Sequence, residues 1–122
     1  MVKEIKEMLI CELRDAGVKH TPEKIVDIRR TRDGRVIFLE DGSSWAGLQH
    51  IITRHEEDFV RRGIAREDIA QAVMTAAIEG EIVRMQGNRP VYKVSYKGQE
   101  QLIAVTVSDN GYIVGANPVS LA

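Results

Sequence analysis

The sequence predicts an α+β protein with helices in the first two thirds of the chain and antiparallel strands in the last third. Apolar residues recur at helical spacing in stretches that end near residue 79, and short apolar runs alternate with turn residues after that point. The turns between those runs are short, which favours antiparallel pairing over the long crossovers of a parallel sheet. With 122 residues, 43% of them hydrophobic, the chain is expected to form a single domain over residues 1–122.

Three amphipathic helices are expected. The first covers about residues 2–16, and Gly17 follows as a stop signal. The second starts at residue 45 or 46 and ends at residue 61. The third covers about residues 66–79, with Gly80 as its C-terminal cap.

Two groups of strands are expected. Runs near residues 24–30 and 35–40 flank Asp33-Gly34 and predict an N-terminal hairpin, because Asp-Gly supplies the positive φ that a tight turn needs. The second group forms a meander, with strands near residues 81–86, 90–97, 100–108 and 111–117.

The charge is nearly balanced, at −1, which counts against a strongly basic nucleic-acid-binding protein. The basic residues are nevertheless clustered. Four arginines lie between residues 29 and 35, and residues 81–97 contain a single acid, Glu81, among four basic residues. These clusters either form a basic face or are solvated charges on exposed strands.

The location expected for this chain is the cytoplasm, without membrane association. The single cysteine, Cys11, cannot form an internal disulfide, and the N-terminus lacks the apolar run of a signal peptide. No segment approaches the roughly 20 apolar residues that a membrane-spanning helix needs. Phosphate-binding, dinucleotide-binding and serine-hydrolase motifs are also absent, so no cofactor is expected.

The most distinctive segment lies on the second helix and contains His50, Arg54 and His55. His50 and Arg54 share a face, whereas His55 lies about 140° from His50, on the apolar side of the helix. Histidine can transfer protons near neutral pH, and arginine can bind a phosphate with two hydrogen bonds. The alternative is a surface His50 and a core His55. The spacing is poor for a shared metal ion and no Cys or Asp completes a set, so no metal site is expected.

The later strands supply further candidates. Alternation places Lys93 on one face of its strand and Tyr92 on the other. Lys93 could stabilise a phosphorane, and Tyr92, Tyr96 or Tyr112 could stack on a base. The alternative is a set of exposed strand residues on a half-solvated sheet.

The order of these pieces resembles the barnase–EndoU–colicin D–RelE nuclease superfamily, in particular its phage-associated and polymorphic-toxin branches. The resemblance covers about residues 42–118. It consists of the Gly-Leu-x-His-Ile-x-x-Arg-His helix, a second helix after Arg62-Gly63-Ile64, and the strands up to Gly115-Ala116-Asn117-Pro118. It implies helices packed on one face of a four-stranded antiparallel sheet. Residues 1–41 add the N-terminal helix and hairpin.

The resemblance also implies a function, namely metal-independent endoribonuclease activity of the toxin type on tRNA or other cellular RNA. A ribose 2′-hydroxyl would attack the adjacent phosphate and leave a 2′,3′-cyclic phosphate. The expected catalytic residues are His50, Arg54 and His55, with Lys93 as a looser match. Nucleic-acid binding is expected at Arg84, Arg89, Tyr92, Tyr112 and Asn117. The expected partners are RNA, tRNA above all, and an immunity protein, antitoxin or host protein.

The end of the last strand departs from the family's pattern. Relatives tend to carry a Thr-Ala-Tyr-Pro-like run, which this chain replaces with Gly115-Ala116-Asn117-Pro118. The hydroxyl groups are lost, although Asn117 keeps polarity and Ser120 is near in sequence. The departure motivates a second hypothesis, a non-cleaving binding module of phage or mobile-element origin that captures a host protein or nucleic acid. A housekeeping enzyme has no motif in its favour.

Overall fold

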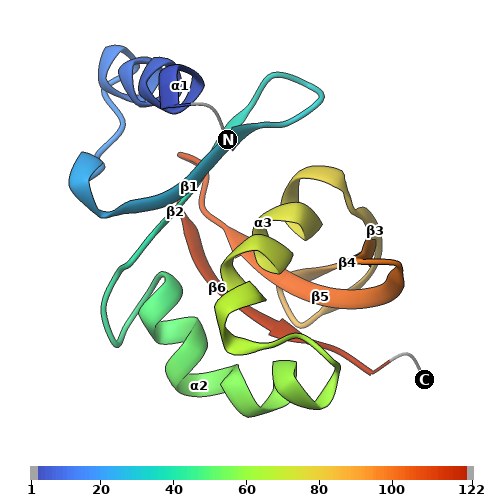
Figure 1. The fold of residues 1–122 in the computed structure, drawn as a ribbon. Helices are drawn as coiled ribbons and strands as arrows, with labels where there is room; N and C mark the ends of the chain where they lie inside the picture. Colours follow the sequence, from blue (N-terminus) through green and yellow to red (C-terminus); the bar gives the residue numbers. More distant parts are fainter. Residues whose placement is uncertain (1–2, 121–122) are drawn as a thin grey trace.

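A four-stranded antiparallel sheet organises the C-terminal half of the chain (Figure 1). The computed structural model describes residues 3–120. The strands follow one another in space as they do in sequence, because the turns between them are short. In spatial order they are β3 (Glu81–Gln86), β4 (Arg89–Tyr96), β5 (Gln99–Val107) and β6 (Ile113–Pro118).

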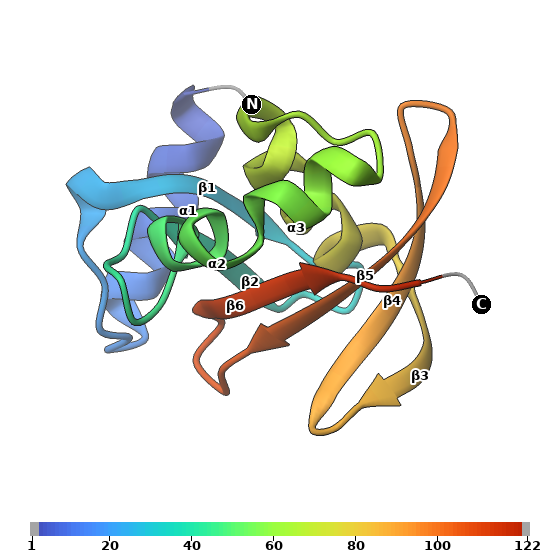
Figure 2. The ribbon, with the colours of Figure 1, turned by 90° about the horizontal axis from the view of Figure 1, so that it is seen from below.

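Two helices cover one face of this sheet, and Figure 2 shows the opposite face without a helix. Helix α2 (Leu48–Arg61) packs mainly on β6, and α3 (Ile69–Glu79), which follows the 3-10 turn η2 (Arg66–Asp68), packs on β4 and β5. The α+β prediction, with helices on one face of a four-stranded antiparallel sheet, is therefore confirmed. The core between the layers is apolar and fully buried at its centre, with Ile51, Phe59, Ile69, Val73, Met74, Ile103, Val105 and Ile113 as members.

The N-terminal part forms a second layer of packing. Helix α1 (Lys3–Asp15) and the turn η1 (Pro22–Lys24) precede a two-stranded hairpin, β1 (Ile25–Arg30) and β2 (Val36–Glu40). One side of the hairpin packs on α1 through Ile28 and Phe38. The other side contributes Ile37 and Leu39 to the main core. The hairpin also packs on β6, and the N–H of Phe38 donates to the carbonyl of Gly111, in the turn before β6, over 2.9 Å.

The predicted elements are present with small shifts at their ends. The first residue of the predicted N-terminal helix, Val2, lies outside the described residues. The second helix begins at Leu48 rather than at residue 45 or 46. Gly47 is its N-cap with φ of 85°, and the N–H of Ser43 donates to the carbonyl of Ala46, so residues 41–47 form a closed loop instead of a helical turn.

The two glycines expected to stop helices behave differently. Gly17 has φ of +73°, the left-handed conformation typical of a helix stop. Gly80 is the C-cap of α3 but has φ of −74°, so it is not left-handed. A Cβ at Gly80 would lie 2.4 Å from the carbonyl oxygen of Ala76 and 2.8 Å from Cβ of Tyr92. Space, not backbone conformation, therefore requires glycine there.

Within residues 3–120, no helix is both long enough and apolar enough to cross a lipid bilayer.

Candidate functional site

The exposed side of α2 carries two of the expected catalytic residues near its start. His50 lies in the first turn, and its Nδ1 is 2.9 Å from the carbonyl oxygen of Ser44. Because a carbonyl only accepts, Nδ1 carries the proton in the neutral ring and Nε2 is left as an acceptor. Arg54 is exposed one turn later, and it forms no ion pair within the described part of the chain.

His55 is partly buried and is held by a carboxylate. Its Nδ1 lies 3.0 Å from Oδ2 of Asp58, one turn further along α2, and its side chain is 29% exposed. Asp58 is itself 3.5 Å from Nη1 of Arg61. A carboxylate on Nδ1 fixes the orientation of the ring and leaves Nε2 free to accept a proton. The His55–Asp58 pair therefore has a geometry that is suited to a general base.

The open face of the sheet gathers most of the expected nucleic-acid-binding residues. The β3–β4 register pairs Arg84 with Val91 and Gln86 with Arg89, and the β5–β6 register pairs Ala104 with Asn117. Directly paired residues point to the same side of a sheet. Four expected residues thus share the face opposite the helices, namely Arg84, Arg89, Lys93 and Asn117.

Arg89 is the centre of a polar cluster on this open face. Its Nε donates to the hydroxyl of Thr106 over 2.7 Å, and its Nη1 donates to Oδ1 of Asn117 over 2.8 Å. The Asn117 amide nitrogen donates to Oε1 of Gln86 over 3.0 Å. All the hydrogen-bonding neighbours of the guanidinium are neutral, and no carboxylate forms an ion pair with Arg89 within residues 3–120.

Gly115 makes room for this guanidinium. A Cβ at Gly115 would lie 2.8 Å from Nη2 of Arg89, so the guanidinium rests directly against the backbone of β6. Arg89 is half-buried, and this burial lowers the pKa of its guanidinium. Because arginine remains charged at neutral pH, the cluster holds a desolvated cation without a counter-charge. An anion is the partner that such a group lacks.

None of the three tyrosines considered for base stacking lies on this face, and Tyr96 is buried in the main core. Tyr92 lies on the helix side of β4 under Gly80, and burial raises the pKa of its hydroxyl. Tyr112 packs edge-on against Phe38, with ring centroids 5.6 Å apart, and burial likewise raises the pKa of its hydroxyl. Both rings contribute to packing and are partly buried.

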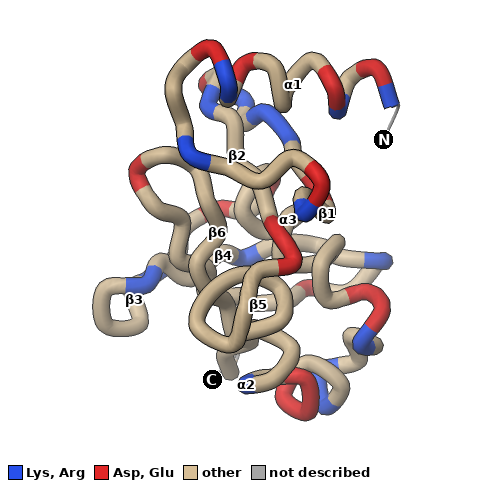
Figure 3. Tube along the Cα trace, turned by 90° about the vertical axis from the view of Figure 1, so that its left-hand side faces the viewer, with Lys and Arg blue, Asp and Glu red and all other residues tan. Residues whose placement is uncertain are grey.

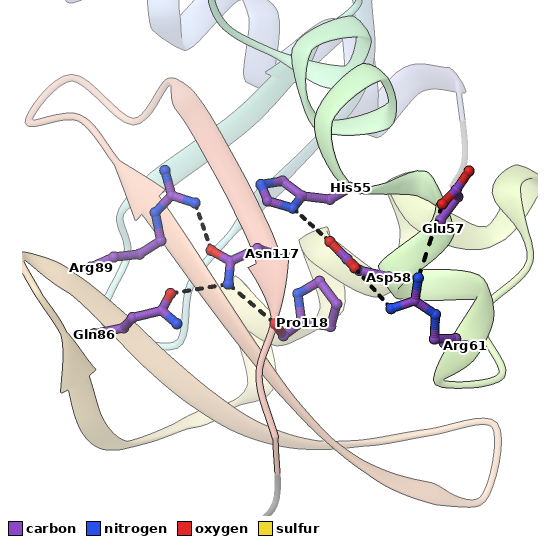
Figure 4. Close-up of polar contacts among 8 residues, drawn as sticks. All are labelled: His55, Glu57, Asp58, Arg61, Gln86, Arg89, Asn117 and Pro118. Atoms are coloured by element: carbon purple, nitrogen blue, oxygen red, sulfur yellow. Dashed lines mark hydrogen bonds and ion pairs between the residues drawn. The ribbon is translucent and has the colours of Figure 1, made fainter.

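The candidates therefore form two groups, one on each side of β6. Figure 4 shows His55 pointing from α2 toward β6, whereas Asn117 points away from α2 toward Arg89. Lys93 belongs to neither group, because it lies further along the open face, 3.5 Å from a carboxylate oxygen of Glu100. The structure does not gather His50, Arg54, His55 and Lys93 into one cluster.

Several residues near these groups were not anticipated from the sequence. Asp58 was visible three positions after His55, a spacing at which helical residues meet. Trp45 was assigned to a helix start, but it lies in the loop before α2 with 85% of its surface exposed. The His50 bond to Ser44 attaches that loop to α2. Thr106 and Gly115 had no local signal, because they meet Arg89 only through the sheet.

Charged residues of both signs are mixed along the chain. Figure 3 shows Lys and Arg interspersed with Asp and Glu along the trace, and the second half of α2 carries Glu56, Glu57 and Asp58. Basic residues are thus not confined to one face, and the arginines between residues 29 and 35 lie in the N-terminal hairpin, where Arg29 pairs with Asp27 and Arg30 with Glu12. Within the part of the chain that the structure describes, no three His, Cys, Asp or Glu side chains are placed to share a metal ion.

Comparison with models of known protein families and with curated protein sequences gave no match.

Proposed function

We propose that this protein is an endoribonuclease of the toxin type that cleaves cellular RNA, tRNA above all, without a metal ion. The observation that carries the proposal is the half-buried Arg89 guanidinium with neutral partners and no carboxylate. The resemblance of residues 42–118 to the barnase–EndoU–colicin D–RelE superfamily supports it. Such an activity would operate in the cytoplasm, where tRNA is found.

Arg89 is suited to hold an RNA phosphate. Thr106 and Asn117 use its Nε and one Nη1 hydrogen, which leaves Nη2 with donors available. A phosphate that binds there supplies the missing negative charge through charge-assisted hydrogen bonds. Arg84 and Lys93 lie on the same face and can contact neighbouring phosphates of the same strand. The open face is thus a surface for an RNA backbone.

The histidines of α2 are suited to move protons. In the proposed reaction His55 removes the proton of the ribose 2′-hydroxyl with its free Nε2, while Asp58 stabilises the imidazolium that forms. The 2′-oxygen bonds to phosphorus, the bond from phosphorus to the 5′-oxygen breaks, and protonated His50 gives a proton to the leaving oxygen. Arg54 stabilises the charge on the phosphorane, whereas Arg89, on the other side of β6, holds another phosphate of the same RNA. The products are a 2′,3′-cyclic phosphate and a 5′-hydroxyl.

Trp45 supplies a more exposed aromatic surface than the packed tyrosines. It lies in the loop that His50 holds through Ser44, so its exposed ring adjoins the start of α2. Aromatic stacking on a base is worth about 1–3 kcal/mol and tolerates any sequence. A base that is stacked on Trp45 would bring its own ribose close to His50.

A second candidate function, RNA or protein binding without cleavage, is favoured by one observation. The two groups of candidate residues lie on opposite sides of β6, and Gly115 and Ala116 provide no hydroxyl where relatives carry Thr-Ala-Tyr-Pro. In that case the Arg89 cluster would bind an anion, and His55 would serve the packing of α2 on β6.

The test is incubation of the purified protein with total bacterial RNA in EDTA, beside His50→Ala and His55→Ala variants. The proposal expects discrete fragments that end in 2′,3′-cyclic phosphate and disappear in both variants. A binding measurement separates the alternatives. Arg89→Met should weaken RNA binding and reduce its salt slope by about one, whereas Arg66→Met, an arginine paired with Glu56, should not.

Each outcome supports or refutes one of the two functions, or refutes both. Binding that depends on Arg89 without any RNA product would support the non-cleaving module and refute catalysis on these RNAs. Neither binding nor cleavage would refute both. Cleavage that persists in His50→Ala and His55→Ala would place the catalytic groups elsewhere.

A further inference from the structure

Strand β3 differs from its neighbours in the sheet because all of its residues are exposed. It is at the end of the sheet order, so one of its edges has no strand partner among the described residues 3–120. Every residue of the strand is exposed to solvent. Three of its side chains are large and apolar, namely Ile82, Val83 and Met85, which are 55%, 42% and 56% exposed. An exposed edge strand with apolar side chains is a template for pairing with another chain.

The register with β4 assigns the β3 side chains to two faces. Ile82 pairs with Tyr92 and Met85 with Pro90, so both apolar side chains lie on the helix side of the sheet. Glu81, Arg84 and Gln86 pair with Lys93, Val91 and Arg89, which places them on the open face. Val83 is the extra residue of the bulge between Ile82 and Arg84. The strand therefore has an apolar side and a charged side.

We propose that β3 pairs antiparallel with β3 of a second copy of this chain, with Ile82 opposite Met85. A two-fold axis between Val83 and Arg84 brings every residue from 81 to 86 opposite a residue of the other copy. It also sets the Ile82 of each copy against the Met85 of the other. The two sheets then join into a continuous eight-stranded sheet, and the two apolar pairs share one face.

The charges of β3 favour the same register. Glu81 and Arg84 have opposite signs, lie on the same face, and form no ion pair within residues 3–120. In the proposed register Glu81 faces Gln86 of the other copy and is diagonal to its Arg84. Diagonal neighbours lie within reach of long side chains. The edge is thus complementary to itself in charge as well as in apolar surface.

Other registers of the same pair are less complementary. A shift by one residue places Ile82 opposite Arg84 and pairs an apolar side chain with a charged one. A shift by two residues sets Ile82 opposite Val83 but moves Met85 opposite Gly80, beyond the end of the strand. The centred register alone satisfies both kinds of side chain.

The interface is small, so we expect a dimer that depends on concentration. A pair of six-residue strands buries less surface than a standard stable interface. The bulge at Val83 adds twist to this edge, which limits further strand addition. The dimer does not rest on the proposed ribonuclease activity, although the two sites adjoin, because Gln86 of β3 accepts from Asn117 in the Arg89 cluster.

The first experiment measures molar mass over a range of protein concentrations by sedimentation equilibrium. The double variant Ile82→Lys/Met85→Lys should weaken dimerisation at least tenfold. The matched control, Ile5→Lys/Met8→Lys, changes the same residue types at similar exposure, 46% and 52%, on α1 and should dimerise like the original chain. Circular dichroism checks that both variants fold, which their exposed positions favour.

The second experiment tests the register by disulfide trapping in a Cys11→Ser background. A mixture of the Ile82→Cys and Met85→Cys proteins should form a cross-linked dimer under oxidation, and either protein alone should not, because each cysteine faces a different residue. A monomer at every concentration would overturn the proposal. A dimer that Ile82→Lys/Met85→Lys and Ile5→Lys/Met8→Lys weaken equally would also overturn it, as would a dimer that neither double variant weakens. Cross-linking of Ile82→Cys with itself would overturn the register.

Discussion

Gly115 and Arg89 depend on each other. The guanidinium lies where a side chain at position 115 would lie, and Thr106 and Asn117 hold it in place. Because position 115 has no side chain, the guanidinium occupies this space, and the anion binding that we propose for the open face depends on it.

Replacement of Gly115 by alanine should therefore impair anion binding more than it impairs folding. The added Cβ would lie 2.8 Å from Nη2 of Arg89, whose flexible side chain can move away. We expect a loss of about 1 kcal/mol or less in the free energy of unfolding, but a loss of RNA affinity similar to that of Arg89→Met. Urea unfolding and filter binding measure the two effects.

The control for this prediction is Thr106→Ser, which keeps the hydroxyl that accepts from Nε of Arg89. It should preserve RNA affinity. Full affinity in Gly115→Ala would show that the position of the guanidinium is unimportant for binding.

The sequence alone could identify individual site residues but not their grouping. Arg84, Arg89, Lys93 and Asn117 were expected at a nucleic-acid or catalytic site, and they do share one face because strand alternation fixes it. The neutral hydrogen-bonding neighbours in the Arg89 cluster were not predictable. Its members come from positions 17 and 28 residues away in the chain, and no local pattern reports such contacts.

At the scale of elements, the end of α3 is set by contact rather than by backbone propensity. The glycine stop signal at Gly80 correctly located the end of the helix, although Gly80 is not in the left-handed conformation that glycine often has at a helix end. The chain passes directly from α3 into β3 there, in an extended conformation, with Tyr92 of β4 against it. Close packing of a helix end on a strand cannot be read from the sequence.

Gly80→Ala should therefore be more destabilising than Gly17→Ala. At Gly80 the new Cβ meets the Ala76 carbonyl and Cβ of Tyr92, which cannot rotate away, and we expect a loss of about 2–3 kcal/mol. At Gly17 nothing lies within 4 Å, and only the positive φ opposes alanine, at about 1 kcal/mol. Urea denaturation of the two variants tests the order. Equal losses would indicate that the α3–β3 junction relaxes.

The start of α2 is the clearest error in predicted boundaries. Apolar spacing placed Trp45 or Ala46 in the helix, but the backbone at Gly42 and Gly47 has φ of +71° and +85° and closes a loop. The carbonyl of Val114 on β6 accepts the N–H of Gly47, which fixes where the helix can begin. A contact with a strand more than sixty residues later thus overrides the local pattern.

At the scale of the molecule, β2 joins the N-terminal part to the sheet. Its alternating side chains belong to two clusters, with Phe38 packed toward α1 and Ile37 and Leu39 in the main core. Strand order in the meander was predictable because short turns leave one arrangement. The docking of the hairpin on β6 was not, since it depends on the Phe38–Gly111 contact across the chain.

This arrangement predicts that the chain unfolds as one unit, in line with the expected single domain. Ile28→Ala empties a fully buried site in the N-terminal cluster and should cost about 2–5 kcal/mol. The same loss of free energy should be measured from the hydrogen exchange of β5 amides, although β5 packs in the main core and not in the N-terminal cluster. If only α1 and the hairpin lose protection, residues 1–41 form a separate folding unit and the single-domain prediction fails.

The exposed Trp45 has a consequence for how this protein can be observed. It is the single tryptophan of the chain, and its ring is already in water in the folded state. Its emission will therefore change little when the core melts. The same emission should respond when something stacks on the loop before α2, so intrinsic fluorescence is a poor probe of unfolding here and a direct optical probe of ligand.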